Sequence, residues 1–269
     1  MILGLAVAIF GSAGWFAYQL FVKPGQLARE DAISGQAPPP DPSLPALGKA
    51  LDLQKQRKLV EARAALELFL ANYPYSTKLK EAKAALGAVN TDIFFSAIPS
   101  PDKIRYEVRS GDALAKIEHK LKTTRELLMR CNNLDDPTRL RIGQVLLVNQ
   151  PDFAVVLDRK EHTLTLMNHG KFFKQYSVAS WNAPPLKKGM EAVAVAAKVG
   201  DKIAWRAGAR VAFGTKEYEG SERWVELSAK GYTLYTEGGQ KPNAGIAFAP
   251  DDMEELSTLL SKNVPVTLQ

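Results

Sequence analysis

The hydrophobic pattern changes its period along the chain, and that change most constrains how the chain can fold. Between residues 45 and 90, apolar side chains recur at spacings of three and four, as in amphipathic helices. From Phe153 onward, short apolar stretches alternate with polar residues and are separated by Gly, Pro and Asn, as in strands joined by turns. Separate blocks of the two periods predict a multidomain α+β protein.

The N-terminal block is apolar throughout, since residues 2–22 contain no charged side chain. A helix of this length can cross the roughly 30 Å hydrocarbon core of a bilayer. We predict a transmembrane anchor over residues 1–23, with residues 2–22 in the membrane. A cleaved signal peptide is the alternative, but no basic stretch precedes the run and no small-residue cleavage site follows it. Lys23 and Arg29 follow the run and nothing basic precedes it. Taken alone, the tendency of basic flanks to stay in the cytoplasm predicts that the rest of the chain is cytoplasmic.

Two Pro-containing stretches separate the next blocks. We predict a linker over residues 24–44, where the proline content favours extended polyproline II, and a second linker over residues 96–105. Between them, residues 45–95 are predicted as a helical segment in which Pro74 ends the second helix and residues 77–89 form a third. The segment resembles a single tetratricopeptide-type hairpin, a family that docks partners. The alternative is a helical stalk packed on itself or on the next domain.

Charge and cysteine content limit the class of partner. The net charge of +6 and the pI near 9.2 favour anionic surroundings such as wall polymers or lipid head groups. The basic residues are scattered and no basic run is interleaved with aromatic residues, so we expect no nucleic-acid partner. We expect no cofactor and no metal site. The single cysteine, Cys131, is interpreted as a buried small hydrophobe, and a reactive thiol near His119 is the alternative.

The block from 106 to 149 combines both periods in a short span. Asp112 is expected to cap the first helix, and Glu126 is placed for a capping box at the start of the second. Asn132-Asn133 should end that helix, because Asn tolerates the left-handed conformation. The predicted elements are a strand over Tyr106–Val108, a helix through Ile117, a helix from Thr123 or Thr124, and a strand over Val145–Val148.

This βααβ block, with domain bounds 104–149, resembles a LysM domain. The resemblance implies binding of glycans that contain N-acetylglucosamine, such as peptidoglycan and chitin, in a groove between two loops. The residues that carry the resemblance are Tyr106, Val108, Gly111, Asp112, Leu114, Ile117, Thr124, Leu127, Leu128, Asn132, Leu134, Leu140, Gly143, Gln144, Leu146 and Val148. The expected glycan-binding residues are Gly111, Asp112, Ala113, Leu114, Asp135, Asp136, Pro137, Thr138, Arg139 and Leu140.

Side-chain chemistry is compatible with a sugar ligand in these loops. Backbone amides of the Gly-Asp turn can bond an N-acetyl carbonyl, and Leu114 and Pro137 can lie against apolar faces of the ring. Ala113 stands where the family has Thr or Ser, and Ile142 where it has Pro, so we expect modest affinity. A purely structural LysM fold is the alternative.

The C-terminal block, residues 151–269, is predicted as a mostly-β sandwich or barrel. A helix is expected over Asp251–Leu260, with Pro250-Asp251-Asp252 as its cap, and a last strand over Val264–Leu268. Earlier strands are expected at Phe153–Leu157, Thr163–Met167, Phe172–Ala179, Ala192–Lys198, Arg210–Phe213, Trp224–Leu227 and Tyr232–Thr236, with a hairpin turn at Asn168–Lys171.

This block resembles the L,D-transpeptidase (YkuD-like) catalytic domain. The residues that carry the resemblance are Val155-Val156-Leu157, Leu164, Leu166, Gly170-Lys171, Arg223-Trp224-Val225, Leu227, Gly231 to Leu234, Asp252 to Leu256 and Val264 to Leu268. The family's motif, about Ser-His-Gly-Cys-x-Arg, aligns with Pro242 to Ala247. Its cysteine then corresponds to Gly245, its arginine to Ala247, and its upstream histidine to Tyr235.

These three replacements predict an inactive domain, because thiolate catalysis needs the sulfur and a base that ionises it. Ser180 and Ser228 are the candidates for a serine rescue. We therefore expect a non-catalytic, inner-membrane-anchored wall protein on the periplasmic or extracytoplasmic side. It would bind peptidoglycan, with a wall enzyme as a candidate partner. The alternatives are an L,D-transpeptidase with an atypical active site and a scaffold whose helical segment recruits wall enzymes.

Overall fold

The computed structural model describes residues 41–100, 102–185 and 195–269. The predicted anchor (1–23) and nearly all of the first linker lie outside these residues. Within the described ranges no helix is both long and apolar enough to cross a bilayer. The helices there are α3 (Ser43–Lys55), α4 (Leu59–Asn72), α5 (Leu79–Phe95), α6 (Leu114–Leu121), α7 (Arg125–Cys131) and α8 (Pro250–Leu259), with a short 3-10 helix η2 (Lys216–Tyr218).

The helical segment, residues 45–95, is built as the apolar spacing predicts. The third helix is longer than predicted, since α5 continues to Phe95 instead of ending at Val89, because Ile93 and Phe94 in its last turn are buried. The α3–α4–α5 core is formed by Leu47, Ala50, Leu59, Ala62, Leu66, Phe69, Ala82, Leu86, Val89 and Ile93.

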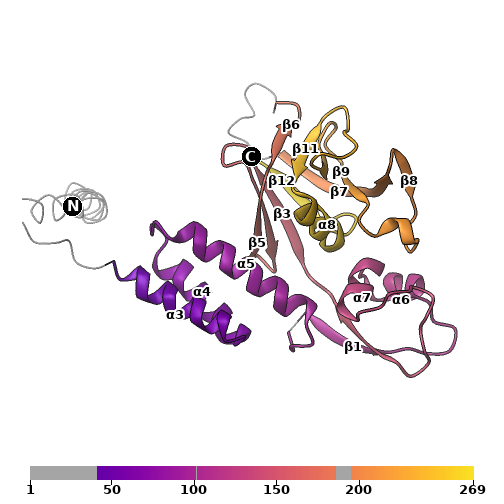
Figure 1. The fold of residues 1–269 in the computed structure, drawn as a ribbon, viewed down its shortest axis with the longest axis horizontal. Coiled ribbons are helices and arrows are strands. Elements are labelled where there is room, and N and C mark those ends of the chain that lie inside the picture. Colours follow the sequence, from indigo (N-terminus) through magenta and orange to yellow (C-terminus); the bar gives the residue numbers. More distant parts are fainter. Residues whose placement is uncertain (1–40, 101, 186–194) are drawn as a thin grey trace, which may run out of the picture. The chain divides into compact units, whose positions relative to one another are not determined.

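Helix α5 is docked on strand β5 of the C-terminal domain (Figure 1). Asn90 Nδ2 donates to the Phe173 carbonyl at 2.8 Å, and the Phe94 ring stacks on Phe153 and Phe173 at centroid distances of 5.7 and 5.6 Å. Lys103 Nζ donates to the Ser96 and Ile98 carbonyls past the end of the helix, at 2.6 and 2.9 Å. The segment therefore packs on itself, as one form of the stalk alternative expects, and on the C-terminal domain.

The central domain, residues 104–149, has the predicted order of elements. Strands β1 (Lys103–Glu107) and β2 (Val145–Asn149) pair antiparallel, with Tyr106 opposite Leu146. Helices α6 and α7 cover this pair, and Tyr106, Val108, Leu114, Ile117, Leu128, Leu146 and Val148 form a small core of their own.

The predicted end of the second helix in this domain is confirmed, since α7 stops at Cys131 and Asn133 has a left-handed φ of 49°. Of the predictions at the helix starts, one is confirmed and two are wrong. Thr124 caps α7, and its Oγ1 accepts from Leu127 N at 3.1 Å. That places Glu126 one position too early for a capping box, and its carboxylate lies 3.4 Å from Lys202 Nζ instead. The N-cap of α6 is Ala113, which forms no side-chain cap bond. The Asp112 carboxylate turns back to accept from the backbone N–H of residue 109 and from the hydroxyl of residue 106.

The C-terminal domain is one ten-stranded sheet with the order β5-β4-β3-β12-β7-β9-β10-β11-β6, in which β8 pairs with β7 (Figure 1). The long strand β7 pairs with both β12 and β9, so the two halves of this predicted sandwich or barrel are joined into one continuous sheet. The strands are β3 (Phe153–Asp158), β4 (Thr163–Asn168), β5 (Lys171–Ser177), β6 (Ser180–Asn182), β7 (Val195–Arg206), β8 (Ala209–Val211), β9 (Glu222–Leu227), β10 (Thr233–Thr236), β11 (Gly245–Phe248) and β12 (Pro265–Leu268).

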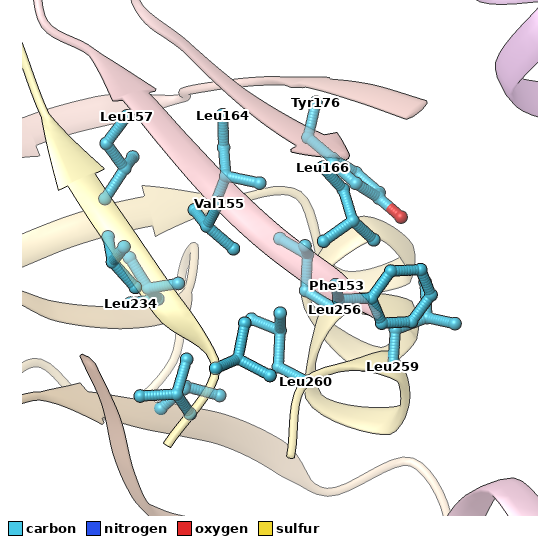
Figure 2. Packing of buried hydrophobic residues seen from close by; sticks show 14 of the residues in the cluster. Phe153, Val155, Leu157, Leu164, Leu166, Tyr176, Leu234, Leu256, Leu259 and Leu260 are labelled. Atoms are coloured by element: carbon cyan, nitrogen blue, oxygen red, sulfur yellow. The ribbon is translucent and has the colours of Figure 1, made fainter. Parts of the chain in front are cut away.

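Both halves of the sheet and helix α8 share one hydrophobic core, which Figure 2 shows from close by. Alternate side chains of β3 and β4 face Leu256 and Leu259 from α8 and Leu260 just after it. The predicted cap of α8 is wrong in detail: Ala249 is the N-cap without a side-chain bond, and Pro250 is the first helical residue.

Candidate functional site

The two loops expected to hold a sugar are preorganised by their own hydrogen bonds. In the first loop, bonds from the backbone N–H of residue 109 and from the Tyr106 hydroxyl lower the pKa of Asp112, so this carboxylate is ionised and fixes the turn. Gly111 adopts φ +81°, which favours glycine. In the second loop, Thr138 N–H and Oγ1 donate to Asp136 at 2.8 and 2.6 Å and lower its pKa.

The loop residues differ in what they can offer a ligand. Leu114 is only 2% exposed and belongs to the core of the domain, so its side chain is not available to lie against a sugar as expected. Pro137 is half-buried and packs toward Gly214 of the C-terminal domain. The exposed members of the expected set are Gly111, Ala113, Asp135, Thr138 and Arg139, with Asp112, Asp136 and Leu140 half-buried.

Cys131 has the environment of a structural thiol. Its side chain is 7% exposed, and Asn149 Nδ2 donates to its sulfur at 2.8 Å. Burial raises the pKa of this thiol to about 11, so the thiolate needed for nucleophilic attack is scarce at neutral pH. Cys131 lies in α7 of the central domain, whereas the family's cysteine position lies on β11.

The residues predicted to stand at the family's catalytic positions adjoin one another in space. Strands β10 and β11 pair in parallel, with Tyr235 beside Ala247. A Cβ placed on Gly245 would lie 2.4 Å from the Thr233 carbonyl oxygen and 3.1 Å from Tyr235 Cδ1. Real Cβ atoms do not approach a backbone oxygen this closely. The backbone therefore leaves no room for a side chain at Gly245, the predicted counterpart of the family's cysteine.

A pocket of about 660 Å³ opens beside this closed position. Its walls include Trp224, Lys230, Thr233, Lys241 and Pro242. Trp224 Nε1 donates to the Gln240 carbonyl at 2.8 Å, which ties the loop between β10 and β11 to strand β9. The pocket thus offers two ammonium groups and an aromatic wall.

Neither candidate serine is activated in the described part of the chain. Ser228 Oγ accepts from Lys198 N at 2.9 Å, a structural bond. Ser180 is exposed on β6, and among the described residues no hydrogen bond joins it to a histidine. His169 Nε2 instead lies 2.7 Å from Asp102 Oδ1 at the turn between β4 and β5. In the described parts of the chain, no group of three or more His, Cys, Asp or Glu side chains lies close enough together to hold a metal ion.

The central domain matches a known protein family. Residues 106–149 match the LysM domain family. The match covers this domain and not the rest of the chain. The chain is also 36% identical over 63 residues to the N-acetylmuramoyl-L-alanine amidase XlyA of Bacillus subtilis, which is 23% of this chain. It spans only 21% of the length of that relative.

Solved structures similar to the chain include L,D-transpeptidases. One from Mycobacterium smegmatis is 10% identical, with 49% of this chain and 76% of that one covered at a TM-score of 0.29. A mutant of the Enterococcus faecium L,D-transpeptidase is 14% identical, with 44% and 50% covered at a TM-score of 0.29. TM-scores of this size carry no argument about individual residues, so the closed Gly245 position and the LysM match remain the informative observations.

Proposed function

We propose that this chain is a non-catalytic cell-wall protein that binds peptidoglycan through its LysM domain. Its C-terminal L,D-transpeptidase-like domain acts as a binding or structural module. The LysM match over residues 106–149 is the observation that carries the proposal. The two preorganised loops, with Gly111, Ala113 and Thr138 exposed, supply a surface for N-acetylglucosamine. The side chain of Leu114 is left out of this surface because it is buried.

The chemistry of the chain supports the absence of thiol catalysis. Cys131 is the only cysteine in the sequence, and it is buried with a pKa near 11. The position that the resemblance assigns to the nucleophile, Gly245, has no room for a Cβ. A pseudoenzyme with a retained pocket accounts for both observations. We propose that Lys230 and Lys241 bind carboxylates of an acidic peptide in that pocket without reacting with it.

Membrane anchoring and location follow from the sequence and from the ligand. We propose that residues 2–22 anchor the chain in the inner membrane. The remaining domains would face the periplasm or another extracytoplasmic space, because the proposed ligand is found there. Protease digestion of intact spheroplasts tests the orientation: domains outside the cytoplasm should be digested, and protection of them would contradict the proposal.

The proposal is tested by sedimentation of the full chain with insoluble peptidoglycan and with chitin. We expect the wild type to cosediment with peptidoglycan and Ala113→Arg to lose most of that binding, because Arg places bulk in the first loop. Ala64→Arg, on the exposed face of α4, is the matched control and should bind like the wild type. Binding that is absent in the wild type, or equal in Ala113→Arg, contradicts the proposal.

The active-enzyme alternative is tested by incubating the chain with muropeptides and with a carbapenem. We expect mass spectrometry to show neither new cross-links nor an adduct. A covalent adduct on residues 151–269 would establish an atypical active site and overturn the assignment as a pseudoenzyme.

A scaffold role is a second candidate, because helix α4 exposes an apolar stripe. Val60 and Leu68 are 47% and 61% exposed, and Tyr75 just after the helix is 89% exposed. Leu68→Glu should abolish capture of a wall enzyme while peptidoglycan binding survives. A surface variant is preferable to deleting the helical segment, since Phe94 of α5 belongs to the C-terminal core.

A further inference from the structure

The segment between β8 and β9 of the C-terminal domain is a built loop that faces the LysM domain (Figure 1). Phe213 and Tyr218 pack edge to face within it, with ring centroids 5.2 Å apart. Arg223 is 5% exposed, stacks over the Tyr218 ring at 3.9 Å and donates to the Tyr218 and Ser221 carbonyls, both at 2.9 Å. Arg206 donates to two further carbonyls of the loop. These contacts hold the loop in one conformation.

Several contacts join this loop to the LysM domain. The Arg125 guanidinium lies 4.9 Å from the Phe213 ring centroid, and the Tyr218 hydroxyl donates to Glu126 at 3.3 Å. Burial raises the pKa of Tyr218 to about 12, so the hydroxyl keeps the proton that it donates. Gly214 adopts φ +82°, and a Cβ there would lie 2.9 Å from Pro137 Cγ. Glycine is therefore needed for the close approach of the two loops.

A cavity of about 320 Å³ remains between them. From the LysM side it is lined by Met129, Asp135 and Pro137, and from the C-terminal side by Phe213, Thr215 and Lys216. Asp135 and Pro137 belong to the second of the two loops that the LysM resemblance assigns to a sugar. Within the described residues, no hydrogen bond or ion pair engages the Asp135 carboxylate or the Lys216 ammonium. The walls thus combine apolar side chains with polar ones, among them the carboxylates of Asp136 and Glu219, and Lys216 is the one cation among the lining residues. Such a mixture of apolar surface and a few polar groups is typical of small-ligand sites.

We propose that this cavity extends the sugar groove of the LysM domain and holds the next sugar of a peptidoglycan strand. The inference rests on the proposed function and deepens it. Phe213 and Pro137 supply apolar surface for the ring, and Asp135 accepts from its hydroxyls. Lys216 binds the acidic substituent that N-acetylmuramic acid carries and chitin lacks: the lactyl carboxylate, or a carboxylate of the attached peptide. The composite groove therefore prefers peptidoglycan to chitin.

The experiment uses the full chain in mild detergent and measures affinity by calorimetry for three probes. These are a peptidoglycan tetrasaccharide with stem peptides, the same tetrasaccharide without peptides, and chitotetraose. We expect the wild type to bind the muramyl probes more tightly than chitotetraose. Lys216→Glu should weaken muramyl binding about three- to tenfold, as expected for reversing one exposed charge contact, and should leave chitotetraose within about twofold. The two muramyl probes distinguish the lactyl carboxylate from the peptide.

Two further variants keep the outcomes separable. Lys160→Glu makes the same charge change in the exposed turn between β3 and β4 and should leave all three affinities unchanged. Ala113→Arg blocks the LysM loop and should weaken all three probes. If Ala113→Arg weakens binding while Lys216→Glu does not, the extension is wrong and the LysM function stands. If the wild type binds none of the probes, the proposed function itself fails. Equal binding of chitotetraose and the muramyl probes overturns the extension.

Discussion

A cysteine placed at Gly245, which the sequence resemblance predicts as the counterpart of the family's nucleophile, should damage the fold. In Gly245→Cys the new Cβ would lie 2.4 Å from the Thr233 carbonyl oxygen and 3.0 Å from Pro242 Cγ. Ordinary carbon–oxygen contacts begin near about 3.3 Å, so the two strands must separate by roughly 1 Å. The Thr233 oxygen is backbone on β10, the strand that pairs with β11, and it has no flexible end that could move aside.

The magnitude follows from the two terms that this separation involves. Overpacking costs about 1–3 kcal/mol, and a weakened backbone hydrogen bond adds about 1 kcal/mol. We expect a loss of about 2–4 kcal/mol in the free energy of unfolding. For a unit of this size each kcal/mol lowers the Tm by about 2–4 °C, so the Tm should fall by roughly 4–16 °C.

Circular dichroism during heating and in urea measures the loss, and two further variants isolate its cause. Gly245→Ala should lose as much as Gly245→Cys, because the clash arises at Cβ and not at the sulfur. Gly48→Cys on α3, where a Cβ meets nothing within 4 Å, should stay within about 1 kcal/mol of the wild type. A Gly245→Cys protein with wild-type stability, or one that forms a carbapenem adduct, would refute the reasoning.

Three more predictions concern the LysM domain. Ala113→Thr should stabilise the protein by about 0.5–2 kcal/mol in urea unfolding, because Ala113 is the extended N-cap residue of α6 and makes no side-chain cap bond. The control Ala115→Thr lies inside the helix and should not stabilise the protein. Cys131 should resist Ellman's reagent at pH 8 until the protein unfolds. The pKa of Cys131 is raised to about 11 from an ordinary 9.0, so the folded state holds the thiol proton more tightly than the unfolded state does. The free energy of unfolding should therefore be undiminished below pH 9 and fall by up to about 3 kcal/mol toward pH 11. Cys131→Ala should not show this fall. Asn149→Leu should cost about 1–3 kcal/mol, because the buried Phe94 carbonyl loses its 3.0 Å donor, and thermal unfolding measures it.

The sequence predicts best where the signal is local. Thr124 as a cap and Pro74 as the end of a helix depend on residues a few positions away, and the structure agrees with both. The order of elements in the LysM domain is equally local. The strands that were missed, β6 and β11, are short and pair across long sequence separations. All four residues of β11 are buried, so it shows no alternation that a pattern could detect.

Site prediction failed where burial decides the role of a residue. The sequence does not distinguish an apolar residue that contacts a sugar from one that packs in the core when both lie beside a turn. Leu114 is in the core because α6 directs this side chain onto β1 and β2. The contact of Pro137 with Gly214 joins residues of two domains, and no local pattern marks such a contact. The error at Leu114 and the unforeseen contact of Pro137 both come from tertiary packing that periodicity does not encode.

Leu127 of the LysM domain and Phe94 of the helical segment both belong to the core of the C-terminal sheet. Only three residues separate the end of β2 from the start of β3. A force applied by a wall polymer to the proposed sugar-binding loops would therefore be transmitted directly to the sheet, because no long flexible linker separates the two domains. Under tension, the helical segment, the LysM domain and the C-terminal domain should unfold together. The bound sugar, as the weakest interaction, should dissociate before any of the three unfolds.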